Sequence, residues 1–283
     1  MDIFYFSGTG NSLYVAKEIY KHLNNSSKVG HQSKNEKVRM IPIVRHMDEK
    51  HPFSDSKRVG FVFPIHLTAM PYPVRDFIKK LELRSAEYVF AAATRIGTFQ
   101  IADTHLRRLL KKKDVKLNAF FILNMASNSP CGLMTKSVPG FKKQAEAWIE
   151  RISPDKLEQF DAKAAEKLGQ IQTTIENRLE YHEDRTFMSP ISKGITCALM
   201  ATTEKMTCKQ QIPFYADHDC TSCGICEDVC LSGKVKIKNG LPTWDPEKPC
   251  YFCYACFNSC PEQAILIKDR YEKKLGRYLH PHI

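Results

Sequence analysis

Two runs of cysteine with the same spacing stand near the C-terminal end of this 283-residue chain. Eight of the eleven cysteines fall in them, and each run follows the pattern C-x2-C-x2-C-x3-C. The members are Cys220, Cys223, Cys226 and Cys230 in the first run, and Cys250, Cys253, Cys256 and Cys260 in the second. Three thiolates two residues apart can surround one corner of an iron–sulfur cube, but the chain cannot curl tightly enough to supply the fourth thiolate locally. The spacing therefore indicates iron–sulfur chemistry with ligands drawn from separate segments.

Zinc is the alternative for clustered cysteines. Zinc sites usually show two C-x2-C pairs, a long spacer and four ligands, and two matched runs of four do not follow that pattern. The stretch resembles the bacterial 2[4Fe–4S] ferredoxins over about 55 residues. One departure is Leu231 after Cys230, where that family usually has proline, whereas Cys260 is followed by Pro261.

The resemblance also implies how the eight thiols are shared. In such ferredoxins the fourth cysteine of each run ligates the other cluster. One predicted set is Cys220, Cys223, Cys226 and Cys260; the other is Cys250, Cys253, Cys256 and Cys230. This crossing would hold together both halves of a domain too small to have much core of its own.

A second candidate site lies near the start of the chain, in a loop rich in glycine and hydroxyl groups. It comprises Ser7, Gly8, Thr9, Gly10, Asn11 and Ser12. The loop joins an apolar run to a helical pattern, and the backbone N–H groups at such a helix start can bind a phosphate. A Walker loop would require a lysine, and a dinucleotide fold would require glycine where Leu13 stands. The loop resembles the FMN-phosphate loop of flavodoxins.

The elements that must position this loop alternate between apolar runs and amphipathic stretches. The pattern predicts strands at residues 2–6, 37–43, 58–64, 87–94 and 116–125, and helices at 11–23, 73–81 and 102–113. The strands are apolar on both faces, which is typical of a parallel sheet with helices on each side. We therefore expect an α/β fold, a flavodoxin-like doubly wound sheet of five parallel strands.

Such a sheet binds its ligand at the carboxyl ends of the strands. The further candidate flavin contacts are Pro64, Ile65 and His66 after the third strand, and Thr94, Arg95 and Gly97 after the fourth. His66 fits a flavin contact and an ordinary loop histidine equally well. Cys131, Cys197 and Cys208 lie outside both cysteine runs, and we predict no ligand role for them.

These patterns divide the chain into four segments. Residues 1–152 are predicted to form the FMN-binding domain, 153–210 a helical connector, 211–270 a small α+β 2[4Fe–4S] domain and 271–283 a basic tail. Within the third segment, Asn239-Gly240 between two strand-like runs predicts a β-hairpin.

The formal charge of +11 raises the question of nucleic-acid binding. The basic residues are scattered and accompany no RNA-binding or helix-turn-helix motif, so solvated helix faces are the better interpretation. No apolar run approaches the roughly 20 residues of a membrane helix. The first residues do not resemble a secretory signal, and we expect a cytoplasmic protein with no membrane span.

A flavodoxin-like head with a two-cluster ferredoxin tail resembles the flavodoxin–ferredoxin fusion proteins of bacteria and archaea, the EFR-type ferrodoxins. The resemblance implies electron transfer between two [4Fe–4S] clusters and FMN. The chain would act as a redox carrier for a partner enzyme, and its basic charge favours an acidic partner that docks near Arg107–Lys113. The alternative is an FMN-dependent reductase that acts on a small substrate, with the ferredoxin domain as electron input. A redox sensor with labile clusters is a weaker third hypothesis.

Overall fold

The computed structural model describes residues 1–26, 37–66, 69–96, 101–129, 148, 150, 152–183, 212–269, 271–274 and 276–283. The chain divides into two compact units. The first contains Met1–Ser7, Asn11–Met125 and Asp161–Met200, and the second contains Gly8–Gly10, Ala126–Phe160 and Ala201–Ile283. The sequence boundary after Phe160 falls inside the long helix α5, Pro154–Glu176.

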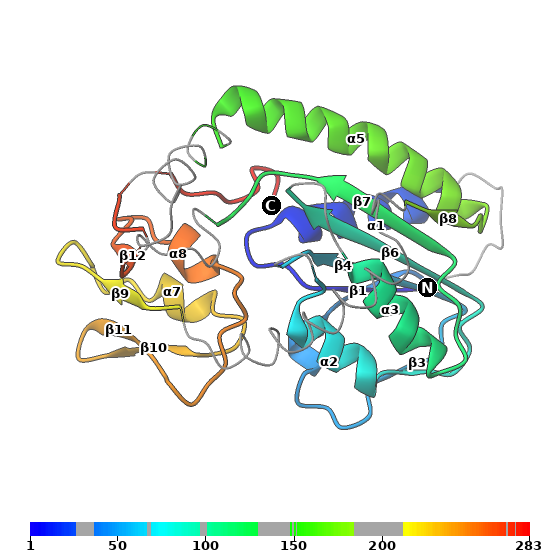
Figure 1. Ribbon diagram of the computed structural model, residues 1–283, viewed down its shortest axis with the longest axis horizontal. Coiled ribbons are helices and arrows are strands. Elements are labelled where there is room, and N and C mark those ends of the chain that lie inside the picture. Colours follow the sequence, from blue (N-terminus) through cyan, green and yellow to red (C-terminus); the bar gives the residue numbers. More distant parts are fainter. Residues whose placement is uncertain are drawn as a thin grey trace. The chain divides into compact units, whose positions relative to one another are not determined.

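The first unit is built on a parallel sheet of six strands in the order β2-β1-β4-β6-β7-β8 (Figure 1). The strands are β1 Asp2–Tyr5, β2 Arg39–Pro42, β4 Arg58–Pro64, β6 Tyr88–Arg95, β7 Ala119–Asn124 and β8 Tyr181–His182. The first five correspond to the five predicted strands. Their spatial order is the 2-1-3-4-5 order of flavodoxin-like folds, so the predicted fold class is confirmed.

The sixth strand, β8, lies within residues 153–210, which the sequence pattern assigns to a helical connector. Helix α5 instead ends at Glu176, and Arg178 adopts the left-handed conformation with φ of 53°. The chain then turns into the sheet, where the Tyr181 amide donates to the Asn118 carbonyl at 3.1 Å. A strand of two residues has no periodicity of its own, which is why the sequence pattern did not reveal it.

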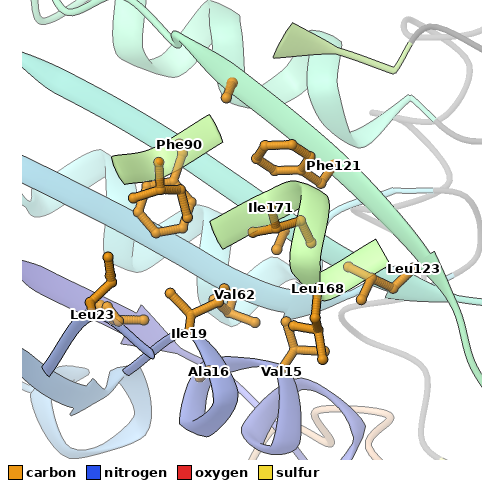
Figure 2. Close-up of a cluster of buried hydrophobic side chains, with 14 of the residues drawn as sticks. Val15, Ala16, Ile19, Leu23, Val62, Phe90, Phe121, Leu123, Leu168 and Ile171 are labelled. Atoms are coloured by element: carbon orange, nitrogen blue, oxygen red, sulfur yellow. The ribbon is translucent and has the colours of Figure 1, made fainter. Parts of the chain in front are cut away.

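Helices cover both faces of this sheet because alternate strand residues point to opposite sides. Figure 2 shows one face, where side chains of α1 (Asn11–Ser26) and α5 pack on strand residues that include Val62, Phe90 and Phe121. On the other face Phe77 of α2 (Tyr72–Lys80) packs on Phe4, with the ring centroids 5.2 Å apart. Helix α3 (Ala102–Lys111) lies beside α2. Burial on both faces explains the continuous apolar character of the strands.

Short elements complete the first unit, and two of them lie beside the start of β1. They are the 3₁₀ helix η1 (Ile43–His46) and the parallel pair β3 (Phe53–Ser54) and β5 (Glu82–Leu83). Asp2 is fully buried there and accepts two hydrogen bonds of 2.7 Å from the Arg39 guanidinium and one of 2.6 Å from the Ser54 hydroxyl. These bonds connect β1, β2 and β3 around one buried carboxylate.

The second unit is small and consists of short elements. In chain order they are β9 Phe214–Ala216, α7 Ile225–Asp228, β10 Val235–Lys238, β11 Leu241–Trp244, α8 Ala255–Asn258 and β12 Ile265–Ile267 (Figure 1). Strands β10 and β11 form the predicted hairpin, with Asn239 and Gly240 at φ of 51° and 77° in its turn. Its core contains a cluster of aromatic rings around Phe257, Trp148 and Tyr271.

The two cysteine runs repeat the same backbone at an offset of 30 residues. Helix α7 begins at Ile225 and α8 at Ala255, and β10 and β12 begin at Val235 and Ile265. The left-handed residues repeat in the same way: they are Ser222, Gly224, Gly233 and Asn239 in the first half, and Phe252, Tyr254, Gln263 and Asp269 in the second. Bulky residues rarely adopt this conformation, and such positions cluster at ligand sites. The duplication therefore includes the three-dimensional course of the chain around each run.

Candidate cofactor sites

The eight cysteines of the two runs line two separate cavities in the second unit. The cysteines of the first cavity are Cys220, Cys223, Cys226 and Cys260; those of the second are Cys230, Cys250, Cys253 and Cys256. Each cavity takes three thiols from one run and the fourth from the other. The structure thus brings together in each cavity the four residues that the sequence assigned to one cluster.

The two short helices explain how three thiols of a run reach one cavity. In each run a left-handed residue directly precedes the helix, Gly224 before α7 and Tyr254 before α8. The reversal of the chain at this point lets the cysteine before it and the cysteine inside the helix, such as Cys223 and Cys226, line the same space. No three Cys, His, Asp or Glu side chains of the described residues form a site for a single metal ion, and the thiols of each set surround an open volume instead.

The environment of the thiols disfavours isolated thiolates. Burial raises the pKa of Cys226 to about 11 and the pKa of Cys253 to about 12, and it raises the pKa of Cys256 well above the ordinary value. A thiol must lose its proton to bind metal. These cavities therefore require bound metal ions whose positive charge compensates the negative charges of the buried thiolates. Iron bound by four thiolates satisfies that requirement.

Each cavity takes one sulfur atom from the other cysteine run, and a backbone N–H group points at that sulfur. The Val235 amide donates to Cys230 Sγ at 3.4 Å, and the Ala264 amide donates to Cys260 Sγ at 3.3 Å. These two bonds occupy nearly equivalent places in the duplicated halves. Donors of this kind stabilise negative charge on sulfur and influence the potential of an iron–sulfur centre.

The glycines of the loop between β1 and α1 are required by close packing within the second unit. A Cβ atom on Gly8 would lie 2.6 Å from both Cβ and the carbonyl oxygen of Cys253. Gly10 has φ of 106°, and a Cβ atom there would lie 2.7 Å from Cβ of His280. Between them, the Thr9 carbonyl accepts a 2.8 Å hydrogen bond from the His280 amide. Any side chain at Gly8 or Gly10 would displace this packing.

Predicted flavin-site residues also meet at the carboxyl ends of the strands in the first unit. The hydroxyls of Ser12, in the first turn of α1, and Thr94, near the end of β6, share a hydrogen bond of 2.8 Å, and both side chains are buried. The Ile65 amide donates to the Thr94 carbonyl at 2.8 Å, which places the ends of β4 and β6 together. Arg95, the last residue of β6, is 6% exposed.

The remaining predicted positions are placed as follows. Pro64 ends β4, and its register partner in β6 is Thr94. Thr9 is 5% exposed, while Ser7 and Asn11 are half-buried. Gly97, Cys131, Cys197 and Cys208 lie outside the described residues.

His66 follows β4 and is held by its backbone, which exchanges two 2.9 Å hydrogen bonds with Ala69. Its ring meets the edge of Phe6, with 6.2 Å between the ring centroids. Burial lowers the pKa of His66 to about 4. The ring is therefore neutral near pH 7 and can both donate and accept a hydrogen bond.

Residues 219–265 match the family model of the 4Fe-4S dicluster domain. The second unit thus carries an iron–sulfur domain, and the match spans both cavities. A search of curated proteins found no match. The described part of the chain contains no helix with the length and apolar character needed to cross a membrane.

Several solved structures share a weak likeness with the chain. Rubredoxin oxygen:oxidoreductase from Desulfovibrio gigas is 14% identical with a TM-score of 0.35, over 62% of this chain and 36% of that one. The two-electron reduced flavodoxin of Megasphaera elsdenii is 14% identical with a TM-score of 0.31, over 52% and 96%. An FMN-dependent NADH-azoreductase from Bacillus anthracis in complex with FMN is 11% identical with a TM-score of 0.36, over 62% and 97%. This chain therefore spans little more than a third of the Desulfovibrio protein.

Two residues beside the second cavity were not singled out from the sequence. Lys234 and Trp244 both line it. Lys234 is one of 42 basic residues, and nothing in its neighbours in the sequence distinguishes it from an exposed lysine. The available signal was the duplication, in which Lys234 takes the place that Ala264 has in the other half, 30 residues later.

Proposed function

We propose that this protein is an electron carrier that holds two [4Fe–4S] clusters and FMN. The observation that carries the proposal is the presence of two four-cysteine cavities, built with crossed ligands, in a chain whose other unit has the flavodoxin strand order. The clusters exchange single electrons, whereas FMN accepts one or two, so a chain with both connects one-electron and two-electron partners.

The residues of the cavities fit the clusters by their chemistry. The first cavity would bind one cluster through Cys220, Cys223, Cys226 and Cys260, and the second would bind the other through Cys230, Cys250, Cys253 and Cys256. The protein holds the thiols in place through the left-handed turns before α7 and α8. Apolar neighbours such as Ile225 and Ile265 shield part of the first cavity from water, although Cys223 is exposed.

The loop Ser7–Ser12 is the proposed site of the FMN phosphate. Its support is the position of the loop after β1, next to the point where the strand order of the sheet reverses. The hydroxyls of Thr9 and Ser12 and the first N–H groups of α1 supply donors for an anion. Thr94 orients the Ser12 hydroxyl through their shared hydrogen bond. Pro64, Ile65, His66 and Arg95 are proposed to border the flavin.

An acidic redox partner follows from the charge of the loaded protein. Each cluster with its four thiolates contributes a charge of about −2, and the FMN phosphate contributes about −2. The formal charge of +11 therefore remains positive after loading. On α3 and the turn after it, Arg108, Lys111 and Lys112 are exposed, whereas Arg107 contacts His182 and Lys113 donates to the Lys79 carbonyl. Arg108, Lys111 and Lys112 are the proposed docking patch.

The experiment that tests the proposal uses the full chain, purified anaerobically. We expect about eight irons, about eight acid-labile sulfides and one FMN per chain. Stoichiometric zinc without sulfide would overturn the iron–sulfur part, and the absence of flavin would overturn the FMN part. Turnover of small electron acceptors at enzyme-like rates would favour the reductase alternative over the carrier.

The docking patch is tested by electron-transfer rates with an acidic ferredoxin across a salt series. Steered association falls steeply with ionic strength. The double variant Arg108→Glu with Lys112→Glu should slow transfer at low salt and flatten the salt dependence. The matched control is Lys156→Glu with Lys163→Glu, which makes the same charge change at exposed positions of α5. Equal effects of the two double variants would show that only net charge matters.

A further inference from the structure

The lining of the second cavity contains a buried lysine. Lys234 is 2% exposed, and its ammonium donates to the backbone carbonyls of Asp245 and Lys248, the latter at 2.7 Å. Both carbonyls lie in the segment that leads to the second cysteine run. Lysine is almost never fully buried unless its charge has partners. Here the partners are two carbonyl dipoles, and Cys250, Asp245 and Cys230 interact electrostatically with the ammonium, in that order of strength.

A tryptophan contributes a second feature to the same cavity. Trp244 ends β11, and its ring stacks on Phe214 with the centroids 5.9 Å apart. Its indole N–H is buried and has no hydrogen-bond partner among the described residues. Because Trp244 lines the second cavity, this N–H is available to a sulfur atom of a bound cluster. The indole is therefore placed to donate to a cluster ligand.

The first cavity lacks both features, although the backbone around it is the same. The duplication places Ala264 where the other half has Lys234, and the lining of the first cavity includes Glu262 but no lysine or tryptophan. A cation does lie in the same half of the duplication as Cys260. The Arg277 guanidinium donates to the Gln263 and Ile265 carbonyls and lies over the ring of Phe257, but it is not part of the lining of the first cavity.

We propose that Lys234 and Trp244 make the second cavity hold the more easily reduced of the two clusters. The proposal rests on the presence of the clusters in the proposed function. Reduction by one electron takes a four-thiolate [4Fe–4S] centre from a charge of −2 to −3, so a fixed positive charge and N–H···S donors favour the reduced form. With both clusters bound, an electron that a one-electron donor delivered to the cluster in the first cavity would therefore pass to the cluster in the second; the first cluster would be oxidised and the second reduced.

Solvent favours reduction of the cluster in the first cavity, because Cys223 is exposed and water also stabilises a more negative centre. This effect reduces the difference in potential between the two clusters. A full charge inside the protein is screened far less than a charge in water, so the buried ammonium has the larger effect. We expect the two clusters to differ at least tenfold in their equilibrium constant for reduction, which for one electron is about 59 mV.

The test is an anaerobic redox titration of the full chain, followed by electron paramagnetic resonance. It compares Lys234→Met, just before β10, with Lys238→Met, which removes the same charge from an exposed position at the end of β10. Lys234→Met should lower the midpoint potential of the higher-potential wave by about 59 mV, which is a tenfold decrease in the equilibrium constant for reduction. The midpoint potential of the lower wave should stay the same. Trp244→Phe should move the same wave in the same direction by less. Lys238→Met should move neither wave appreciably.

Three outcomes would overturn the proposal: coincident waves in the unmodified chain, a shift of the lower wave by Lys234→Met, or equal shifts for Lys234→Met and Lys238→Met. Trp244→Phe keeps the test available if Lys234→Met does not load its clusters. Iron, sulfide and flavin analysis of each sample separates this proposal from the proposed function. Full iron without flavin refutes the FMN assignment and leaves this proposal standing, whereas full cofactor content with unshifted waves refutes this proposal alone.

Discussion

Replacement of Cys260 by alanine tests how the eight cysteines are divided between clusters. Cys260 belongs to the second run in the sequence, yet it lines the first cavity with Cys220, Cys223 and Cys226. With one cluster per cavity, loss of this thiol should remove about four of about eight irons. The remaining cluster should be the one in the second cavity.

Double variants make the division quantitative. Cys260→Ala combined with Cys223→Ala removes two thiols of the same cavity, so the chain should still hold about four irons. Cys260→Ala combined with Cys253→Ala removes one thiol from each cavity, and the iron content should fall close to zero. Cys197→Ala is the control, because that cysteine lies outside both runs.

The measurement is iron and acid-labile sulfide per chain after anaerobic purification, with chain concentration from amino-acid analysis. The losses of iron should not add for two substitutions in the same cavity, and they should add for one substitution in each cavity. The reasoning is refuted if Cys260→Ala with Cys253→Ala retains about four irons while Cys260→Ala with Cys223→Ala retains none. That result would mean that each cluster takes all four ligands from its own run.

Three further predictions concern the first unit and the loop. His66, whose pKa burial lowers to about 4, should show no titration between about pH 5.5 and 8 in NMR spectra of the histidine-labelled chain, and a midpoint near 6.5 would contradict this. Burial raises the pKa of Asp2, but hydrogen bonds from Arg39 and Ser54 more than offset it, so the pKa lies below its ordinary value. The carboxylate therefore stabilises the fold above about pH 4 and loses this effect as pH falls through its folded-state pKa. Asp2→Asn should cost about 2 kcal/mol in urea unfolding at pH 7 and less at low pH, and an equal cost at both would exclude the charge effect. Thr9→Glu should abolish flavin binding because a carboxylate repels the phosphate, whereas the isosteric Thr9→Val should retain it; unchanged FMN content in Thr9→Glu would refute the loop assignment.

Much of the fold follows from local patterns in the sequence. The central strands β1, β4, β6 and β7 were predictable because they are buried on both faces, as β6 shows with all eight residues from Tyr88 to Arg95 buried. The hairpin between β10 and β11 was predictable because Asn239-Gly240 readily adopts positive φ. The order of the strands could only be expected by resemblance, because pairing depends on contacts between distant segments. The termination of α5 before β8 depends on Arg178 and on sheet pairing, and neither has a periodic signal.

The candidate sites show the same division between local and distant information. The resemblance to two-cluster ferredoxins predicted which cysteines could share a cluster, because spacing alone indicates only that three thiols of a run lie together and that the fourth comes from elsewhere. The bond between Ser12 and Thr94 joins residues 82 positions apart. Ser12 was a candidate through the hydroxyl-rich loop that resembles an FMN-phosphate loop, and Thr94 because it lies at the end of a predicted strand. Lys234 carried no signal alone. Its burial arises when the segment Asp245–Lys248 folds over it and supplies two carbonyls.

The duplication in the second unit explains why two similar cavities can have different chemistry. The backbone turns repeat at an offset of 30 residues, from Ser222 and Phe252 through Asn239 and Asp269, and these turns fix where the thiols lie. The side chains between the turns are free of that constraint, and at one equivalent position they differ by a full charge, Lys234 against Ala264. Two centres held by the same backbone but surrounded by different charges have different potentials, and a difference in potential gives electron flow a direction. Charge at this single position is therefore the variable through which the order of reduction can be reversed: Lys234→Met combined with Ala264→Lys should move the higher potential to the first cavity.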